Sequence, residues 1–196
     1  MARIQRITLI AGVCLFAAAN PAGAGIKFAN YPDRKASECA AKAEKDGLVV
    51  GVQPMDDTKD QKVYFGTNMT EKGYLPVYLV VENQSSGDSY LFDKSNVALA
   101  GASADAVKEA RSKRGETLAM FGVGGIFAMN AIAKGTEVQE NLLKKEIQSK
   151  TLSPRLSVNG FLYVPIPKEG ARGGISLQIP LANTRTDEVR VINITF

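Results

Sequence analysis

The chain has 196 residues, enough for one domain with its own hydrophobic core. Hydrophobic residues make up 45% and charged residues 22% of the chain, a balance that excludes an intrinsically disordered protein. The formal net charge of +4 comes from Lys and Arg interspersed with Asp and Glu, so nucleic acid is not an expected partner.

The first 24 residues have the features of a secretory signal peptide. Arg3 and Arg6 make a basic start, residues 7–19 are apolar and uncharged, and residues 22–24 are the small residues that a signal peptidase accepts. Their removal leaves 22 basic and 20 acidic residues, a net charge of +2. We therefore expect export across the inner membrane and a periplasmic protein, with membrane association or a retained N-terminal anchor as open alternatives.

Two cysteines bear on the compartment and the chemistry. Cys14 lies inside the apolar run, and Val13 before it is larger than the residue that lipoprotein cleavage prefers, so lipidation is the lesser alternative. The mature chain keeps only Cys39, which excludes an intramolecular disulfide. The Ala, Glu and Lys residues around it predict a packed position on a helix.

The first half of the chain predicts short helices and strands in alternation. Helix-forming residues before Gly47 predict a helix over 36–47, and Asp and Gly at its ends predict another over 56–66. Strands are expected over residues 48–53, 74–83, 89–93 and 96–99. In the strand 74–83, alternation places four apolar side chains on one face: Leu75, Val77, Leu79 and Val81.

A helical insertion is expected at about 103–150. Its composition predicts helices over 104–114 and 136–150, the second with an inward stripe of Val138, Leu142 and Ile147. Strands return over residues 155–165, 173–181 and 188–196, and alternation puts Leu156, Val158, Leu162 and Val164 on one face of the first.

About seven short strands separated by turns predict an antiparallel, immunoglobulin-like β-sandwich interrupted by this helical insert. We expect residues 25–196 to form a single domain of this kind. The Cys, Trp and Cys spacing of antibody domains is missing because the chain has no Trp, so the expected likeness is to the wider class of sandwiches.

Two groups of short motifs carry a resemblance to a known class. Thr151-Leu-Ser-Pro154 is followed by Gly160-Phe-Leu-Tyr163, and Tyr64-Phe-Gly66 precedes Leu75-Pro-Val77 and Glu82-Asn83. Together they resemble uncharacterised bacterial envelope proteins with an immunoglobulin-like domain, from which Arg155 departs because such proteins carry Gly after the Pro. The resemblance implies a sandwich in the cell envelope and transfers no catalytic residue.

Several catalytic chemistries are excluded by composition. The chain has no His, which removes His-dependent triads and His metal sites. Asp56, Asp57 and Asp60 lack the spacing of a calcium loop and are better interpreted as helix caps. The Gly122-Val-Gly-Gly125 run has no Lys or Ser/Thr after it to hold phosphate. We therefore predict no catalytic, cofactor-binding or metal-binding residues and no enzymatic activity.

The uncharged stretch 117–133 is the candidate interaction segment. As a helix its 17 residues would span about 25 Å, short of the roughly 30 Å hydrocarbon core, and Asn130 would oppose insertion. Packing on the sandwich, contact with a membrane and self-association all remain open. The residues with most of its apolar and small character are Leu118, Phe121, Gly122, Gly124, Gly125, Ile126, Phe127 and Ala128.

These observations predict a non-enzymatic binding or scaffold protein of the bacterial cell envelope, with an envelope protein as partner and no cofactor. An exposed sheet edge or the helical insert would engage that partner. The alternative is a membrane-contacting or apolar-ligand and lipid-binding protein that acts through Leu118–Ala133.

Overall fold

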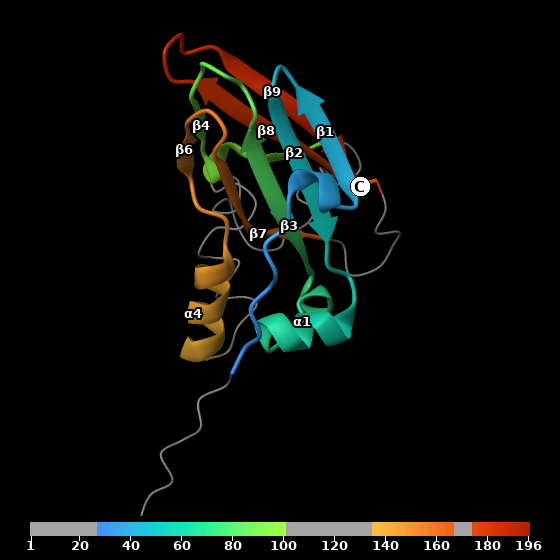
Figure 1. The fold of residues 1–196 in the computed structure, drawn as a ribbon. Helices are drawn as coiled ribbons and strands as arrows, with labels where there is room; N and C mark the ends of the chain where they lie inside the picture. Colours follow the sequence, from blue (N-terminus) through green and yellow to red (C-terminus); the bar gives the residue numbers. More distant parts are fainter. Residues whose placement is uncertain (1–26, 101–134, 167–173) are drawn as a thin grey trace, which may run out of the picture.

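The computed structural model describes residues 27–100, 135–166 and 174–196, which form two antiparallel β-sheets packed together (Figure 1). The strands are β1 (Ala41–Lys45), β2 (Leu48–Pro54), β3 (Tyr74–Asn83), β4 (Tyr90–Phe92), β5 (Ala98–Ala100), β6 (Lys150–Leu152), β7 (Ser157–Pro165), β8 (Ser176–Asn183) and β9 (Val189–Thr195). The helices are η1 (Ala36–Glu38), α1 (Thr58–Phe65), η2 (Thr70–Lys72), η3 (Lys94–Asn96) and α4 (Thr136–Lys145). This arrangement confirms the prediction of a mainly β, sandwich-like fold.

The first sheet, sheet A, has the strand order β1-β2-β3-β7. Its central strand β3 pairs with both neighbours, in registers that place Val81 opposite Val50 and Leu79 opposite Gly160. The predicted face of β3 lies in the core between the sheets, and Tyr78 and Val80 on the opposite face are buried too. Because β7 ends the strand order, one of its edges has no partner strand in sheet A.

The second sheet, sheet B, is organised around β8. Strand β9 pairs with β8 over residues 176–182, so β4 and β5 share the other edge of β8, and β6 pairs with the far side of β4. Strands β4 and β5 therefore continue each other along β8, and η3 lies between them. The connection from β5 to β6 contains α4.

The prediction of a helix over 36–47 is wrong, except that Ala36–Glu38 form the short helix η1. Residues 41–45 form strand β1, which pairs with β2 through a two-residue turn at Asp46 and Gly47. Both turn residues have positive φ, 52° and 77°, as a type I′ hairpin turn requires. Ala41 and Ala43 pack against the core between the sheets, so hairpin pairing overrides the helix propensity of these residues.

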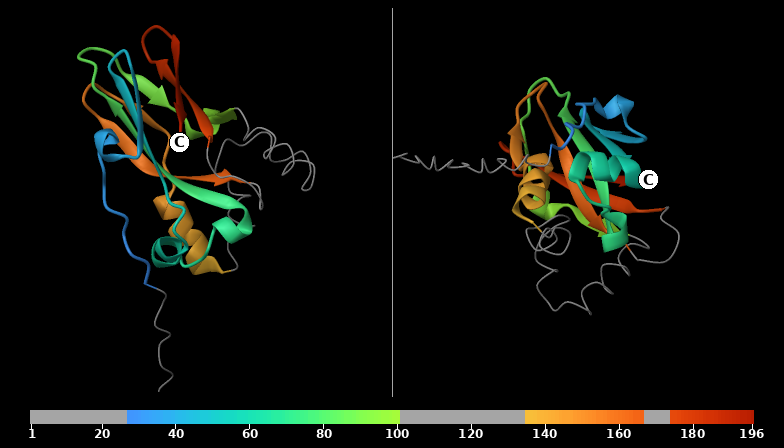
Figure 2. Two further views of the ribbon diagram at one scale, coloured as in Figure 1. Left: turned by 90° about the vertical axis from the view of Figure 1, so that its right-hand side faces the viewer. Right: turned by 90° about the horizontal axis from the view of Figure 1, so that it is seen from below.

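Two apolar clusters stabilise the fold. The larger lies between the sheets and contains the alternating residues of β3, β7 and β8, including Ile175, Leu177, Ile179 and Leu181. The smaller lies on the outer face of sheet A, where Phe65 of α1 and Leu142 of α4 cover Tyr78 and Phe161. Figure 2 shows α1 and α4 close together at one end of the molecule.

The remaining expectations are confirmed in most places. Strands form at all the predicted positions, and α1 occupies the helix predicted over 56–66. Helix α4 ends at Lys145, so Ile147 lies beyond the helix and packs between the sheets instead of completing a helical stripe. Leu156 is 46% exposed and precedes β7, so its predicted inward position is wrong. The predicted helix 104–114 lies outside the described residues.

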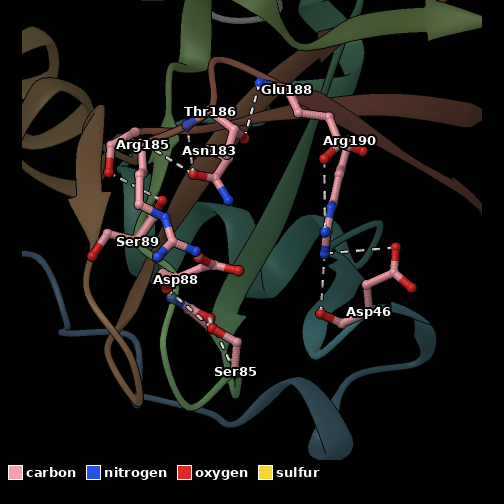
Figure 3. A network of polar contacts seen from close by, with 11 residues as sticks. Asp46, Ser85, Asp88, Ser89, Asn183, Arg185, Thr186, Glu188 and Arg190 are labelled. Atoms are coloured by element: carbon pink, nitrogen blue, oxygen red, sulfur yellow. Dashed lines mark hydrogen bonds and ion pairs between the residues drawn. The ribbon is translucent and has the colours of Figure 1, made fainter.

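The opposite end of the sandwich from α1 and α4 is closed by polar contacts between turns (Figure 3). Arg190 Nη1 lies 3.6 Å from Asp46 Oδ2, and its guanidinium carbon stands 5.4 Å from the centre of the Tyr90 ring. Arg185 and Asp88 form an ion pair of 2.6 Å. These contacts join the β1–β2, β4 and β8–β9 regions and so fix the two sheets relative to each other.

Candidate functional site

A cavity of about 590 Å³ opens on the outer face of sheet A, beside β7. Its lining comes from the N-terminal segment 30–33, the α4–β6 connection 144–150, the first part of β7 (157–161) and Tyr78 of β3. We call this cavity the β7 trough. Its volume lies within the range of roughly 300–1,000 Å³ that is usual for ligand sites.

The floor of the trough is aromatic and firmly packed. The Tyr31 ring lies 4.7 Å from the Tyr78 ring and 4.9 Å from the Phe161 ring, between ring centres. Tyr31 also contacts Tyr64 of α1 at 5.2 Å, and the Ala29 N–H donates to the Val63 carbonyl at 3.2 Å. The N-terminal segment is thereby held against the sheet and forms a fixed wall.

The Tyr78 hydroxyl is buried without a hydrogen bond among the described residues. Burial raises the pKa of this hydroxyl to about 12, and the charge of Asp33 adds to the increase. The backbone N–H of Arg34 lowers that pKa without reaching ordinary hydrogen-bond geometry. Tyr78, a residue of the trough lining, therefore holds a buried hydroxyl with no hydrogen-bond partner in the described part of the chain.

Glu146 supplies a second unsatisfied group. Its Oε2 accepts a hydrogen bond of 2.7 Å from Lys94 Nζ, whereas its Oε1 is buried with no partner in the described part of the chain. The side chain is only 4% exposed. Burial raises the pKa of this carboxyl, although the bond and charge of Lys94 act to lower it.

The position of Glu146 follows from the way the chain crosses β7 after α4. The Ile147 N–H donates to the Phe161 carbonyl at 3.0 Å, and Glu146 and Phe161 form a parallel bridge. Gly160 permits this approach because a Cβ there would stand 2.6 Å from both N and Cα of Ile147. Beyond the crossing, the chain leaves sheet A and enters β6 of sheet B.

The edge of β7 remains open before this crossing. The Ile147 bond shows that the peptide groups of Phe161 point away from β3, and this direction alternates along an antiparallel strand. The peptide groups of Asn159 and Ser157 therefore point outward too. The Ser157 carbonyl accepts only a long bond of 3.5 Å from Lys150 Nζ, and Asn159 has no outward partner among the described residues.

The charges around the trough are mainly positive. Lys144 is exposed and has no acidic partner among the described residues, and Lys150 reaches only the Ser157 carbonyl. Lys145 donates to Asn141 Oδ1, and desolvation lowers the pKa of its ammonium group. Asp33 is the exposed carboxylate of the lining, since the charge of Glu146 is paired with Lys94.

The candidate segment predicted from sequence, Leu118 to Ala128, lies outside the described residues, and its role stays a prediction. The trough residues were missed because they come from four distant parts of the chain. No local signal identifies them: an acid beside a buried residue, as at Glu146 and Ile147, is also found at Glu82 and Val81.

Two other sequence interpretations concern single residues. Asp57 caps α1, since its Oδ1 accepts from the N–H groups of Lys59 and Asp60, which confirms the capping role for this residue; Asp60 lies in the first turn of the helix and Asp56 precedes the cap. Cys39 ends η1 instead of lying on a longer helix, so its predicted helical position is wrong. The thiol is half-buried, and desolvation raises its pKa.

Two antiparallel sheets with short helices on one outer face define a mainly β, sandwich-like protein with a polar trough. Comparison with protein-family models, curated proteins and solved structures finds no match for this chain. None of the helices within 27–100 and 135–166 is long and apolar enough to cross a bilayer, and the described residues contain no cluster of three potential metal ligands.

Proposed function

We propose that the protein is a non-enzymatic binding module of the bacterial cell envelope that holds a partner protein in the β7 trough. Residues 1–24 would direct it across the inner membrane into the periplasm. The trough offers hydrogen-bonding groups, cations and an aromatic floor, which are the components of a binding site.

The observation that carries this proposal is that Tyr78 and Glu146, which both line one cavity, each hold a buried polar atom with no hydrogen-bond partner among the described residues. Buried polar atoms are nearly always hydrogen-bonded, and each exception costs about 1–3 kcal/mol. A partner that enters the trough would supply the missing bonds. The free-energy cost of these unpaired groups is then offset in the complex, and this gain favours binding.

The strand order supports an immunoglobulin-like arrangement within the sandwich class. Strands β2, β3 and β7 correspond to A, B and E, and β9, β8, β4 and β6 correspond to G, F, C and C′. Strand β1 is an addition outside A, and no described strand takes the place of D. The stretch 103–150 then occupies the C–C′ connection, and its last residues, 144–150, line the trough. Such a fold supports binding in general, and the trough supplies the specific site.

Site-specific photocrosslinking in cells tests this function. A photoreactive residue at Gln148 or Asn159, both in the lining, should give a discrete adduct in the periplasmic fraction. The controls are Thr186 and Gln178, which are exposed and lie outside the lining. The adduct should weaken when Lys144→Glu is added. Adducts at the control positions with none in the trough would contradict the proposal, as would turnover of a hydrolase substrate that trough variants abolish.

A further inference from the structure

We propose that the β7 trough takes an extended, acidic peptide segment that pairs with the outward peptide groups of Ser157 and Asn159. This inference rests on the proposed function and specifies the chemical class of the partner segment.

The open edge favours an extended backbone. The crossing at Phe161 already uses this edge for one strand-like pairing, with the Ile147 N–H donating to the Phe161 carbonyl at 3.0 Å. A peptide placed before the crossing would continue that pairing at Asn159, and strand addition to an exposed edge is a common mode of peptide recognition. The other edge of sheet A carries the charged pair Lys42 and Glu44 on β1, as edges that avoid pairing do.

A peptide also fits the two unsatisfied side chains. Glu146 Oε1 can only accept a hydrogen bond while ionised, and a peptide N–H is a donor. The Tyr78 hydroxyl can donate to a peptide carbonyl. Because each peptide unit carries one donor and one acceptor, a single extended segment supplies both kinds of partner.

The charge of the lining selects acidic side chains. Lys144 and Lys150 stand at one wall without acidic partners among the described residues, and Asp33 stands at the other wall. An acidic segment would meet complementary charge at the α4–β6 connection, which increases the association rate and disfavours basic competitors.

The aromatic floor argues against a glycan. Tyr78 is 3% exposed and Phe161 is 1% exposed, so neither presents a free ring face on which a sugar could stack. The partly exposed Tyr31 ring packs against both of them, and the guanidinium carbon of Arg34 stands over it, 5.5 Å from the ring centre. These rings support the trough, while the exposed lysines and the strand edge face the ligand.

The test uses purified mature protein and three short fluorescent peptides in which valine alternates with aspartate, serine or lysine. Fluorescence anisotropy should show the aspartate peptide binding at least about tenfold more tightly than the lysine peptide, with affinity falling as salt rises. The double variant Lys144→Glu, Lys150→Glu should reverse this order. The matched variant Lys59→Glu, Lys45→Glu reverses two charges outside the trough lining and should leave the order of peptide affinities unchanged.

A second pair of variants tests the strand pairing. Asn159→Pro removes the outward N–H of residue 159 and leaves the hydrogen bonds between β7 and β3 in place, whereas Asn159→Ala keeps that N–H. The Pro variant should bind the aspartate peptide at least about tenfold more weakly than the Ala variant, while both retain the native circular dichroism spectrum. Equal binding by Pro and Ala, or an unchanged charge preference in the Lys144 and Lys150 variant, would overturn the inference.

The photocrosslinking experiment separates this inference from the proposed function. If the trough gives a specific adduct in cells but none of the three peptides binds, the binding function stands and the peptide class is wrong. Binding of a soluble envelope glycan in place of the peptides would also overturn the inference. Loss of both the adduct and peptide binding would overturn the two proposals together.

Discussion

The α carbon of Gly160 lies against the backbone of Ile147, with no room between them for a side chain. A Cβ at position 160 would stand 2.6 Å from both N and Cα of Ile147. Backbone atoms cannot rotate away as a side chain can, so the chain after α4 would have to shift. This contact places Glu146 at the trough and Ile147 in the core.

Gly160→Ala should therefore lower the free energy of unfolding by about 1–3 kcal/mol, the usual cost of overpacking. Its φ of 153° adds backbone strain for any other residue. Urea denaturation measures the loss. Gly87→Ala is the matched control, because a Cβ there meets nothing within 4 Å, and it should change stability by less than about 0.5 kcal/mol. A neutral Gly160→Ala would mean that the crossing is not held as described.

Two tyrosines on neighbouring strands should respond in opposite ways to loss of the hydroxyl. Tyr163 Oη donates a hydrogen bond of 2.8 Å to the Leu142 carbonyl, so Tyr163→Phe should cost about 1 kcal/mol of stability. Tyr78→Phe removes an unsatisfied group and should leave stability unchanged or raise it by about 1 kcal/mol. Thermal unfolding of both variants checks this contrast.

The functional part of the same prediction concerns binding. If the trough uses the Tyr78 hydroxyl, Tyr78→Phe should weaken the crosslinked adduct although the protein is as stable as wild type. A stable Tyr78→Phe variant with an undiminished adduct would remove this hydroxyl from the site.

The ion pair of Lys94 and Glu146 connects η3 to the wall of the trough. Lys94→Met leaves a buried carboxylate with neither oxygen paired and should cost about 1–3 kcal/mol. Glu146→Gln should cost less, because a neutral amide is cheaper to bury than a carboxylate. In a double-mutant cycle measured by urea denaturation, the second substitution should lower the free energy of unfolding less when the first is already present. Additive losses would show that the two residues are not coupled.

Much of the fold follows from local patterns. The alternation of Leu75, Val77, Leu79 and Val81 specifies both a strand and its buried face, because the side-chain period of a strand is two. The same rule places the apolar residues of β8. Asp46 and Gly47 carried a hairpin signal as well, but the Ala, Glu and Lys residues before them favour a helix locally, and only pairing with β2 settles the conformation.

The site follows from no such pattern. Tyr31, Tyr78, Glu146 and Asn159 meet because the sandwich brings their segments together, and each alone has an ordinary local context. Glu146 is informative only once its burial and its one free oxygen are known. The stretch 117–133 is recognised from sequence because a run without charged residues is a local property. A trough built from distant residues is recognised only from the three-dimensional structure.

The free energy of unfolding should depend on pH through the ionisation of Glu146. Because burial raises its pKa above the ordinary value of 4.5, the folded state holds this proton more tightly than the unfolded state. Its contribution to stability is full below 4.5 and is lost as pH rises through the raised pKa. Wild type should therefore lose stability relative to Glu146→Gln as pH rises from 4.5 toward neutrality.

Asp93 provides the internal control for this measurement, since its pKa shifts the other way. Hydrogen bonds from the backbone and side chain of Ser95 lower the Asp93 pKa below 3.8, so its contribution is present above that pH and is lost as pH falls through the lowered pKa. Asp93→Asn should therefore differ from wild type in its pH dependence only in strong acid, outside the Glu146 window. Urea denaturation of both variants across the range measures the two effects separately. If the free energy of unfolding of Glu146→Gln changes with pH as that of wild type does between pH 4.5 and neutrality, the carboxyl is solvated. The trough then holds no buried acceptor for a partner.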